Sequence, residues 1–486
     1  MTSLKNIIVT VDKSRAAQII RRVFSSYYFP FITAIVVGGC FCLGWDIVTA
    51  WYVCLCGAAI LIFCRDATPV VGILLLVQIM VSVQNSPHEL ASASNYYFTP
   101  AHLAQEIICV ILFGSAVIAR TVTGIVRGRF RPTPLFWGMV FLGVAFMLSG
   151  VFYSHYTAKN LLYGAILAAI LLFVFVFVSG NVGAGERTFM QIACYAISLF
   201  TALAIELIYI YCTTEGLIVG GMVQRHKLFF GWGTYNSCGM LLTLSVPAWY
   251  YLAIKTKFGF LGLFGAAVNV IACFFSMSRQ SMVVSLAMAL ACTVWLMIAC
   301  KGKRRIICAA VIGVLLVVAA VVLSVLSAKI KVFFDVLFGS ISTGGGRTPL
   351  WNTSIRNFLR KPLFGVGFFD PVAPPNDVGH SDPGFTSLIP WLSHNTVFQL
   401  MSACGLTGLV VYCVHRAQTV ISLLDDFNCG RLLIAFIISC FLLCCLLDVY
   451  IFDLFHTIMY SLLVALLSAT GGRKDKAKKF NAVNLR

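Results

Sequence analysis

The chain has 486 residues, of which 60% are hydrophobic and only 11% are charged, and its mean hydropathy is +0.94. So much apolar surface excludes an ordinary water-soluble globular protein of this length. The net charge of +18 does not by itself indicate a nucleic-acid partner, because a protein with many membrane spans retains its basic residues on the cytoplasmic side.

Apolar segments recur from one end of the chain to the other, and we interpret them as transmembrane helices. The predicted spans cover residues 30–45, 49–64, 68–84, 103–120, 134–153, 161–179, 190–212, 238–254, 257–276, 280–300, 306–326, 395–415, 431–449 and 453–470. An even number of spans puts both termini on one side, and most of the 35 Lys and Arg residues then lie on that side, which we assign to the cytoplasm. The sequence therefore predicts an all-α polytopic membrane protein with about 14 transmembrane helices, within a range of 12–14.

This reading divides the chain into five parts. They are a basic cytoplasmic tail (1–28), eleven spans (29–326), a large extracytoplasmic loop (327–394), three spans (395–470) and a second basic tail (471–486). We expect the first tail to be retained, because no small-residue cleavage site lies near the first apolar run. The 19 cysteines lie almost all within or beside apolar segments, which favours helix packing over disulfides or zinc ligation.

Basic residues on the outer side gather in a few places. Arg225 and Lys227 lie in one outer loop, Arg279 lies at a helix break, and further basic residues lie in the loop 327–394. One explanation is that long loops escape the charge rule. The other is an extracytoplasmic site for phosphate or pyrophosphate, which guanidinium groups bind well. For Arg279, in "CFFSMSRQSMVV", the alternatives are a functional charge beside lipid and an arginine that snorkels to the interface.

The long loop contains the sequence "TGGGRTPLWNTSIRNFLRKPLFGVGFFD", which predicts a short amphipathic helix. Thr348 suits its N-cap and Pro349 its first helical position. Arg356 and Arg360 share one side of this helix, where they either anchor it to lipid head groups or bind phosphate. The apolar residues on another side are Trp351, Ile355, Phe358 and Leu359.

Arg347 and His394 are the strongest candidates for chemistry. Arg347 follows three glycines at the start of the predicted helix, where free backbone N–H groups already favour anions. His394 stands in "LIPWLSHNTVFQL", where the loop ends and an apolar helix begins. An imidazole there is either a proton-transfer group or a histidine without chemistry at the membrane border. His380, in the same loop, is a rival base.

Two asparagines support these candidates. Asn395 either caps the helix that follows His394 or orients the imidazole, and Asn236, in "HKLFFGWGTYNSCGM", is interpreted as an N-cap.

In this order, the motifs "FFGWGTYN", "SMSRQ", "GGRTPLW", "KPLFGVGF" and "HNTVFQLMSACGLTGL" resemble the O-antigen ligase/O-antigen polymerase superfamily of bacterial envelope glycan polymerases and ligases. The resemblance covers roughly Leu228 to Leu409. Where many relatives carry an acidic residue just before the Gly-x-x-Gly pair, this chain has Cys404 before Gly405 and Gly408.

The resemblance implies a GT-C-like membrane glycosyltransferase that needs neither a metal nor another cofactor and that inverts the anomeric carbon. The donor would be a glycan on undecaprenyl pyrophosphate, and the acceptor would be a hydroxyl of another glycan. His394 would be the general base, and Arg279 and Arg347, with Arg356 and Arg360 nearby, would hold the pyrophosphate. Such an enzyme works on the extracytoplasmic face of the bacterial cytoplasmic membrane in surface polysaccharide biosynthesis, beside chain-length regulator and flippase proteins.

Two other readings stay open. The enzyme could be a ligase that transfers the glycan to lipid A core or to protein. From a different class, a polysaccharide flippase or transporter would use charges within the membrane, for which Glu106 and Glu206 in predicted spans are candidates. Asp448 and Asp453, near the last outer turn, could pair with arginines at helix ends.

Overall fold

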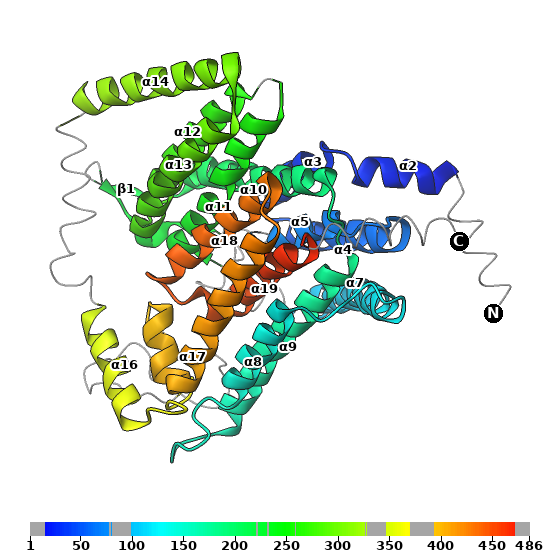
Figure 1. Ribbon diagram of the computed structural model, residues 1–486, viewed down its shortest axis with the longest axis vertical. Coiled ribbons are helices and arrows are strands. Elements are labelled where there is room, and N and C mark those ends of the chain that lie inside the picture. Colours follow the sequence, from blue (N-terminus) through cyan, green and yellow to red (C-terminus); the bar gives the residue numbers. More distant parts are fainter. Residues whose placement is uncertain are drawn as a thin grey trace. The chain divides into compact units, whose positions relative to one another are not determined.

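The computed structural model describes residues 15–76, 79, 99–219, 222–230, 233–257, 259–325, 327, 347–369 and 393–471 (Figure 1). These residues form two compact units, and each unit is described by itself. Unit 1 comprises residues 1–130 and 180–325, and unit 2 comprises residues 131–179 and 326–486.

Unit 1 is built from helices, most of them apolar, and two short hairpins. Its helices are α2 (Arg15–Phe24), α3 (Phe29–Leu43), α4 (Asp46–Phe63), α5 (Thr68–Leu76), α7 (Pro100–Val126), α10 (Glu186–Thr213), α11 (Tyr235–Lys255), α12 (Phe260–Phe275), α13 (Arg279–Ala299) and α14 (Gly302–Val325). The strands β1 (Ile218–Val219) and β2 (Met222–Val223) pair antiparallel, as do β3 (Phe229–Phe230) and β4 (Gly233–Thr234), and the 3-10 turn η3 (Arg225–Lys227) lies between the hairpins. Helix α10 packs against α3 and α11, and α11 packs against α12 and α13.

Unit 2 contains α8 (Pro134–Met147), α9 (Ala158–Asn181), which ends where unit 1 resumes, α16 (Thr348–Arg360), α17 (Thr396–Asp425), α18 (Cys429–Cys445), the 3-10 turn η5 (Tyr450–Phe452) and α19 (Leu454–Ala469). Helix α17 packs against α8 and α16, and α16 lies beside the first turns of α17 (Figure 1). Helix α16 confirms the short helix expected in the long loop, although it begins one residue earlier than expected. Arg347, not Thr348, is the residue at its N-cap, and it makes no side-chain cap.

A backbone break in α17 shapes unit 2. Gly405 has φ 63° and ψ −155°, a conformation that suits glycine alone, and it interrupts the helical hydrogen bonds. The segment after α16 fills the break: the amides of Val366 and Gly367 donate to Ser402 and Ala403 carbonyls at 2.9 and 3.1 Å. In the other direction, the Leu406 amide donates to the Pro362 carbonyl at 2.7 Å, so backbone groups freed by the break are satisfied.

The same segment is tied to the connection between α8 and α9. The Gly150 amide donates to the Phe364 carbonyl at 2.8 Å, and the Phe368 amide donates to Oδ1 of Asn160 at 2.6 Å. The "KPLFGVGF" motif and the "SACGLTGL" motif are therefore two halves of one packed structure. It supports both α16 and the start of α17.

Each of the fourteen predicted spans coincides with a helix, although the segment 68–84 is described as a helix only over Thr68–Leu76. Among the described residues, eight helices are long and apolar enough to cross a membrane, or nine if α2 and α3, bent by 76°, form one broken span. Helices α8, α12, α18 and α19 are apolar but shorter. The chain is thus an all-α multi-pass membrane protein, while the count of fourteen crossings stays a prediction.

Candidate functional site

The first turn of α17 holds the Ser-His-Asn sequence in a defined geometry. Oδ1 of Asn395 accepts hydrogen bonds from the amides of Val397 and Phe398 at 2.9 and 3.2 Å, which confirms the helix-capping alternative for this residue. Immediately before it, the Ser393 amide donates to Oε1 of Gln399 at 2.8 Å, and Oγ of Ser393 donates to the Asn395 carbonyl at 2.9 Å. The backbone on both sides of His394 is therefore fixed.

His394 itself has a left-handed backbone, with φ of 52°. This conformation costs a residue other than glycine about 1–2 kcal/mol, so the capping contacts around it must hold it in place. The strained turn directs the imidazole toward the turn that follows α18. There, Nδ1 of His394 lies 3.0 Å from Oδ1 of Asp448.

The pair orients the imidazole. Oδ1 of Asp448 also accepts from the Val449 amide at 3.0 Å, which fixes the carboxylate. A carboxylate only accepts hydrogen bonds, so Nδ1 carries the proton and Nε2 has the free lone pair. The His394 side chain is 37% exposed and that of Asp448 only 12%. Among the described residues Nε2 makes no hydrogen bond, so this nitrogen is available to a reactant.

The turn formed by residues 446–448 gathers further candidate residues. Nδ2 of Asn395 donates to the Leu446 carbonyl at 2.7 Å, and Nη1 of Arg347 donates to the Leu447 carbonyl at 2.6 Å. Asn395, Arg347 and His394 thus bond to three consecutive residues of this turn. The structure brings together two candidates, Arg347 and His394, that lie at opposite ends of the long loop in the sequence.

Helix α16 is docked so that Arg347 reaches this turn. Nε1 of Trp351 donates to the Ser393 carbonyl at 3.2 Å, and its ring stacks on Phe398 with 5.4 Å between the centroids. Nδ2 of Asn357 donates to Oγ of Ser402 at 3.1 Å in the buried interface with α17. Polar side chains therefore form much of the face that α16 presents to the unit.

Arg356 and Arg360 lie on the exposed part of α16. Ile355 and Leu359 are exposed with them, at 38% and 70%, so apolar and basic groups face outward together. This arrangement agrees with an amphipathic helix at a membrane surface. A contact of either arginine with pyrophosphate stays a prediction. His380 and the loop aspartates Asp370, Asp377 and Asp382 lie outside the described residues.

Arg279 belongs to unit 1, where it is the first residue of α13 and is half-buried. The preceding Met277 has φ of 59°, and the corner that follows is tied to the start of α11: Oγ of Ser278 donates to Oδ1 of Asn236 at 3.2 Å. The interpretation of Asn236 as an N-cap is wrong, because Thr234 occupies the N-cap position and Oδ1 of Asn236 accepts from Ser278, the N-cap residue of α13. Two of the sequence motifs thus meet beside Arg279.

Sequence reasoning missed the role of Asp448. It noted this residue only as an acid near the last outer turn, available to arginines. The signal was weak, because an acidic residue after an apolar run can pair with any cation nearby. The partner, His394, lies 54 positions away in the chain, and no local pattern connects the two.

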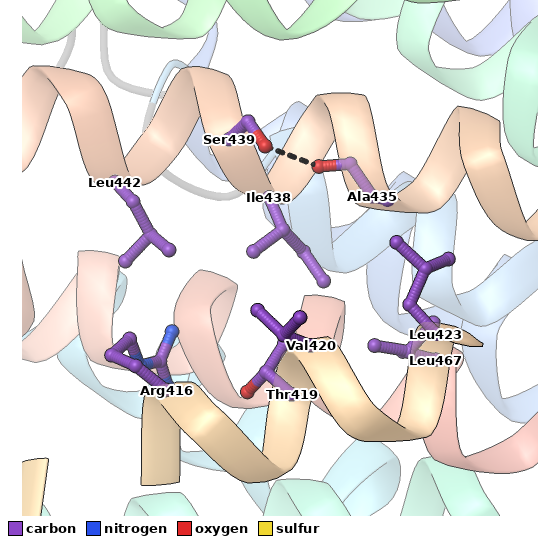
Figure 2. A pocket seen from close by; sticks show the side chains of 9 residues that line it. All are labelled: Arg416, Thr419, Val420, Leu423, Ala435, Ile438, Ser439, Leu442 and Leu467. Carbon is purple, nitrogen blue, oxygen red and sulfur yellow. Dashed lines mark hydrogen bonds between the residues drawn. The ribbon is translucent and has the colours of Figure 1, made fainter. Parts of the chain in front are cut away.

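A cavity elsewhere in unit 2 has a different character (Figure 2). It is lined by Arg416, Thr419, Val420, Leu423, Ala435, Ile438, Ser439, Leu442 and Leu467. The two hydroxyls are already bonded within their own helices: that of Thr419 to the His415 carbonyl and that of Ser439 to the Ala435 carbonyl, both at 2.8 Å. The Arg416 guanidinium lies over the rings of Tyr412 and Tyr460, at 5.1 and 4.9 Å. This lining offers neither carboxylate nor imidazole, so the candidate site is the His394 corner.

The described part of the chain contains no cluster of three or more His, Cys, Asp or Glu side chains that could bind a metal ion. Independence from metals stays a prediction, because the loop aspartates lie outside this part.

Unit 2 thus holds an oriented imidazole, His394, and a guanidinium, Arg347, on one turn. Imidazoles suit proton transfer, and guanidinium groups suit anions. Residues 261–413 match the family model described as O-Antigen ligase, and this match supports the resemblance to the O-antigen ligase/polymerase superfamily. The match covers less than half of the chain, and it includes Arg279, Arg347 and His394 but not Asp448. No curated protein matches the chain. The match supports an enzyme of the ligase or polymerase type that acts on lipid-linked glycans at a membrane.

Proposed function

We propose that the chain transfers or polymerises glycan units carried on undecaprenyl pyrophosphate, at the extracytoplasmic face of the bacterial cytoplasmic membrane. The observation that carries this proposal is the turn 446–448, which receives His394 through Asp448 and Arg347 through Leu447. One turn therefore sets the relative position of a base and a cation. Glycosyl transfer from a lipid diphosphate needs both.

In the proposed step, Nε2 of His394 takes the proton of an acceptor hydroxyl as that oxygen attacks the anomeric carbon. The new carbon–oxygen bond forms as the bond from the anomeric carbon to the pyrophosphate oxygen breaks, so a single displacement inverts this carbon. The electron pair leaves with undecaprenyl pyrophosphate. The imidazolium that forms is stabilised by the Asp448 carboxylate at Nδ1.

Arg347 stabilises the leaving group in this proposal. Its Nη1 is held by the Leu447 carbonyl, and the rest of the guanidinium can face the pyrophosphate, whose negative charge grows during the reaction. Arg347 also lies at the N-terminus of α16, where backbone N–H groups favour an anion. Arg279 is proposed to contribute a second cation, supported by its position within the family match and beside the Asn236–Ser278 contact.

The test uses the purified full-length protein with a synthetic undecaprenyl-pyrophosphate oligosaccharide, followed by sizing of the products. A ladder of multimers supports a polymerase. Transfer of one unit to an added lipid A core or peptide acceptor supports a ligase instead. An absence of any transfer, with the lipid protected and folded protein recovered, would contradict both.

A transporter is the second candidate, and one observation favours it. Glu206, in α10, is fully buried, and neither carboxylate oxygen has a hydrogen-bond partner within the described residues. An unpaired carboxyl in a membrane helix is a functional candidate by default. Movement of the lipid-linked glycan across vesicles that is lost in Glu206→Gln but kept in His394→Ala would favour this reading over glycosyl transfer.

A further inference from the structure

Four arginines of unit 1 gather at the end of α7, away from the residues used in the proposed reaction. Arg65 follows α4, Arg120 lies two turns before the end of α7, and Arg127 and Arg129 lie at and just beyond that end. Three of the four, all but Arg120, are exposed side chains. The cluster lies outside residues 261–413, which match the family model, and the proposed glycosyl transfer does not use it.

The backbone explains why the cluster forms. Gly128 has φ of 63°, so the chain reverses direction after α7. The Gly128 amide donates to the Ile125 carbonyl and the Arg129 amide to the Gly124 carbonyl, both at 2.9 Å, which is a Schellman motif. The motif holds Arg127 and Arg129 at the end of the helix.

A side chain then joins this end to the end of α4. Nη2 of Arg120 donates to the carbonyls of Cys64 and Arg65 at 3.0 and 2.6 Å. Its Nε is buried and has no hydrogen-bond partner in the described part of the chain. Because α4 and α7 pack side by side, Arg65 is placed close to Arg127 and Arg129.

The positive charges of the cluster repel one another. Asp66 is the acidic group that acts on Arg120, and its Oδ1 is already used by the amide and hydroxyl of Thr68, at 2.9 and 2.5 Å, and by the Gly183 amide at 3.3 Å. Burial lowers the pKa of Arg129, and repulsion from Arg127 and Arg65 lowers it further. Like charges therefore act on Arg129 from two neighbouring arginines, and a bound anion would relieve this repulsion.

The surface next to the cluster is apolar. Ile118, Val122 and Ile125 recur at spacings of four and three along α7 and are 56%, 52% and 50% exposed. On the neighbouring helix, Ile62 is 66% exposed one residue before the end of α4. A strip of exposed apolar side chains that leads to a cationic cluster has the layout of a phospholipid, with its chains along the strip and its head group at the end.

We propose that Arg65, Arg120, Arg127 and Arg129 bind the head group of an anionic phospholipid, with an acyl chain along Ile118, Val122 and Ile125. Cardiolipin suits the site best, because its two phosphates match four guanidinium groups better than one phosphate does. The sequence assigns this cluster to the cytoplasmic side and the His394 corner to the outer side. The bound lipid is therefore a structural lipid of the cytoplasmic leaflet and not the glycan donor.

The experiment titrates the purified, delipidated full-length protein with cardiolipin, phosphatidylglycerol and undecaprenyl pyrophosphate, and counts bound lipid by native mass spectrometry. The test variant is Arg127→Gln/Arg129→Gln, which removes two exposed charges outside the proposed reaction. The matched control is Lys301→Gln/Lys303→Gln, which removes two exposed charges at the start of α14 of the same unit.

We expect wild-type protein to prefer cardiolipin, the test variant to bind it on the order of tenfold more weakly or worse, and the control to bind as wild type. Equal weakening in both variants would show attraction by net charge alone and would overturn the site. Unchanged binding in the test variant would also overturn it, as would a preference for undecaprenyl pyrophosphate over cardiolipin that disappears in the test variant. Transfer of glycan is read separately, so failure of this proposal is distinct from failure of the proposed function.

Discussion

Unit 2 contains two histidine–aspartate pairs that are alike in distance and opposite in exposure. Nδ1 of His394 lies 3.0 Å from Asp448, and Nδ1 of His456 lies 2.8 Å from Asp453. In the first pair the imidazole is 37% exposed and the carboxylate 12%, whereas in the second the imidazole is 4% exposed and the carboxylate 48%. The first arrangement leaves the imidazole partly exposed, and the second buries it.

The surroundings of the two pairs explain this difference. Asp453 is the N-cap of α19, and its Oδ1 accepts from the amides of Phe455 and His456 at 3.0 and 3.3 Å. The residues of the second pair are therefore only three positions apart, and both belong to the cap of α19. The first pair joins two distant segments through a residue with left-handed backbone. The two pairs therefore differ in the exposure of the imidazole and not in contact distance, and we propose that the exposed pair takes part in the chemistry.

Of the substitutions that compare the two pairs, replacement of the exposed imidazole should have the largest effect on the rate of glycan transfer. We expect His394→Ala to lower the rate of glycan transfer by about 10²–10⁴-fold, because the general base is lost. His456→Ala should retain transfer by the molecules that fold, since its ring is buried against Tyr450, with 4.6 Å between the centroids. Transfer rate per folded molecule, measured with the defined lipid-linked oligosaccharide, separates the two. Comparable losses of transfer rate in His394→Ala and His456→Ala would contradict a catalytic role that belongs to the first pair alone.

Replacement of the carboxylates sharpens the same contrast. Asp448→Asn presents an amide that can donate to Nδ1 and so favours the wrong tautomer, and we expect a loss on the order of 10²-fold or more in rate. The loss should be in the maximal rate rather than in the donor concentration needed, because Asp448 acts through His394. Asp453→Asn keeps a capping side chain and should leave the rate near that of wild type. An Asp448→Asn enzyme with wild-type rate and pH profile would contradict the positioning role.

Replacement of Arg347, the cation at the 446–448 turn, should have the next largest effect on the rate of transfer. Arg347→Ala is expected to lower transfer by about 10²-fold, as loss of one group that stabilises developing charge does. Arg347→Lys should recover little, because one ammonium cannot bond to the Leu447 carbonyl and reach the pyrophosphate with the same geometry. Arg356→Ala, on the exposed part of α16, is the matched control and should cost less than about tenfold. A larger loss at Arg356 than at Arg347 would reverse this assignment.

The break at Gly405 in α17 should be visible in the free energy of unfolding of glycine variants. In Gly405→Ala a Cβ would lie 2.6 Å from the Pro362 carbonyl oxygen at a backbone conformation reserved for glycine, and we expect destabilisation of about 1–3 kcal/mol or more. Gly114→Ala meets no atom within 4 Å on α7 and should be neutral or slightly stabilising. Melting temperatures in the same detergent check this, and equal melting of the two variants would argue against the break.

The smallest effect should be at the second pair. Asp453→Ala removes a helix cap and is expected to cost about 1 kcal/mol of stability, with the rate of transfer per folded molecule unchanged. Thermal unfolding of this variant beside Asp453→Asn gives the comparison. A loss of catalytic rate without a loss of stability would mean that the second pair also takes part in the chemistry.

Much of this architecture follows from local sequence patterns. Hydropathy located a helix at each predicted span, and the Asn395 cap followed from its place before an apolar helix. The pairing of His394 with Asp448 and the filling of the Gly405 break by residues 362–367 did not follow, because both join segments distant in the chain. The N-cap prediction for Asn236 failed for a related reason: its partner, Ser278, lies 42 positions away at the N-cap of another helix, so capping propensity alone gave the wrong role.

The most direct test of the central claim is the initial rate of transfer from a synthetic undecaprenyl-pyrophosphate oligosaccharide by purified wild-type protein and by His394→Ala, at equal amounts of folded protein. The account predicts product from the wild type and a rate at least about 10²-fold lower from the variant. A His394→Ala protein that forms product at the wild-type rate would contradict it.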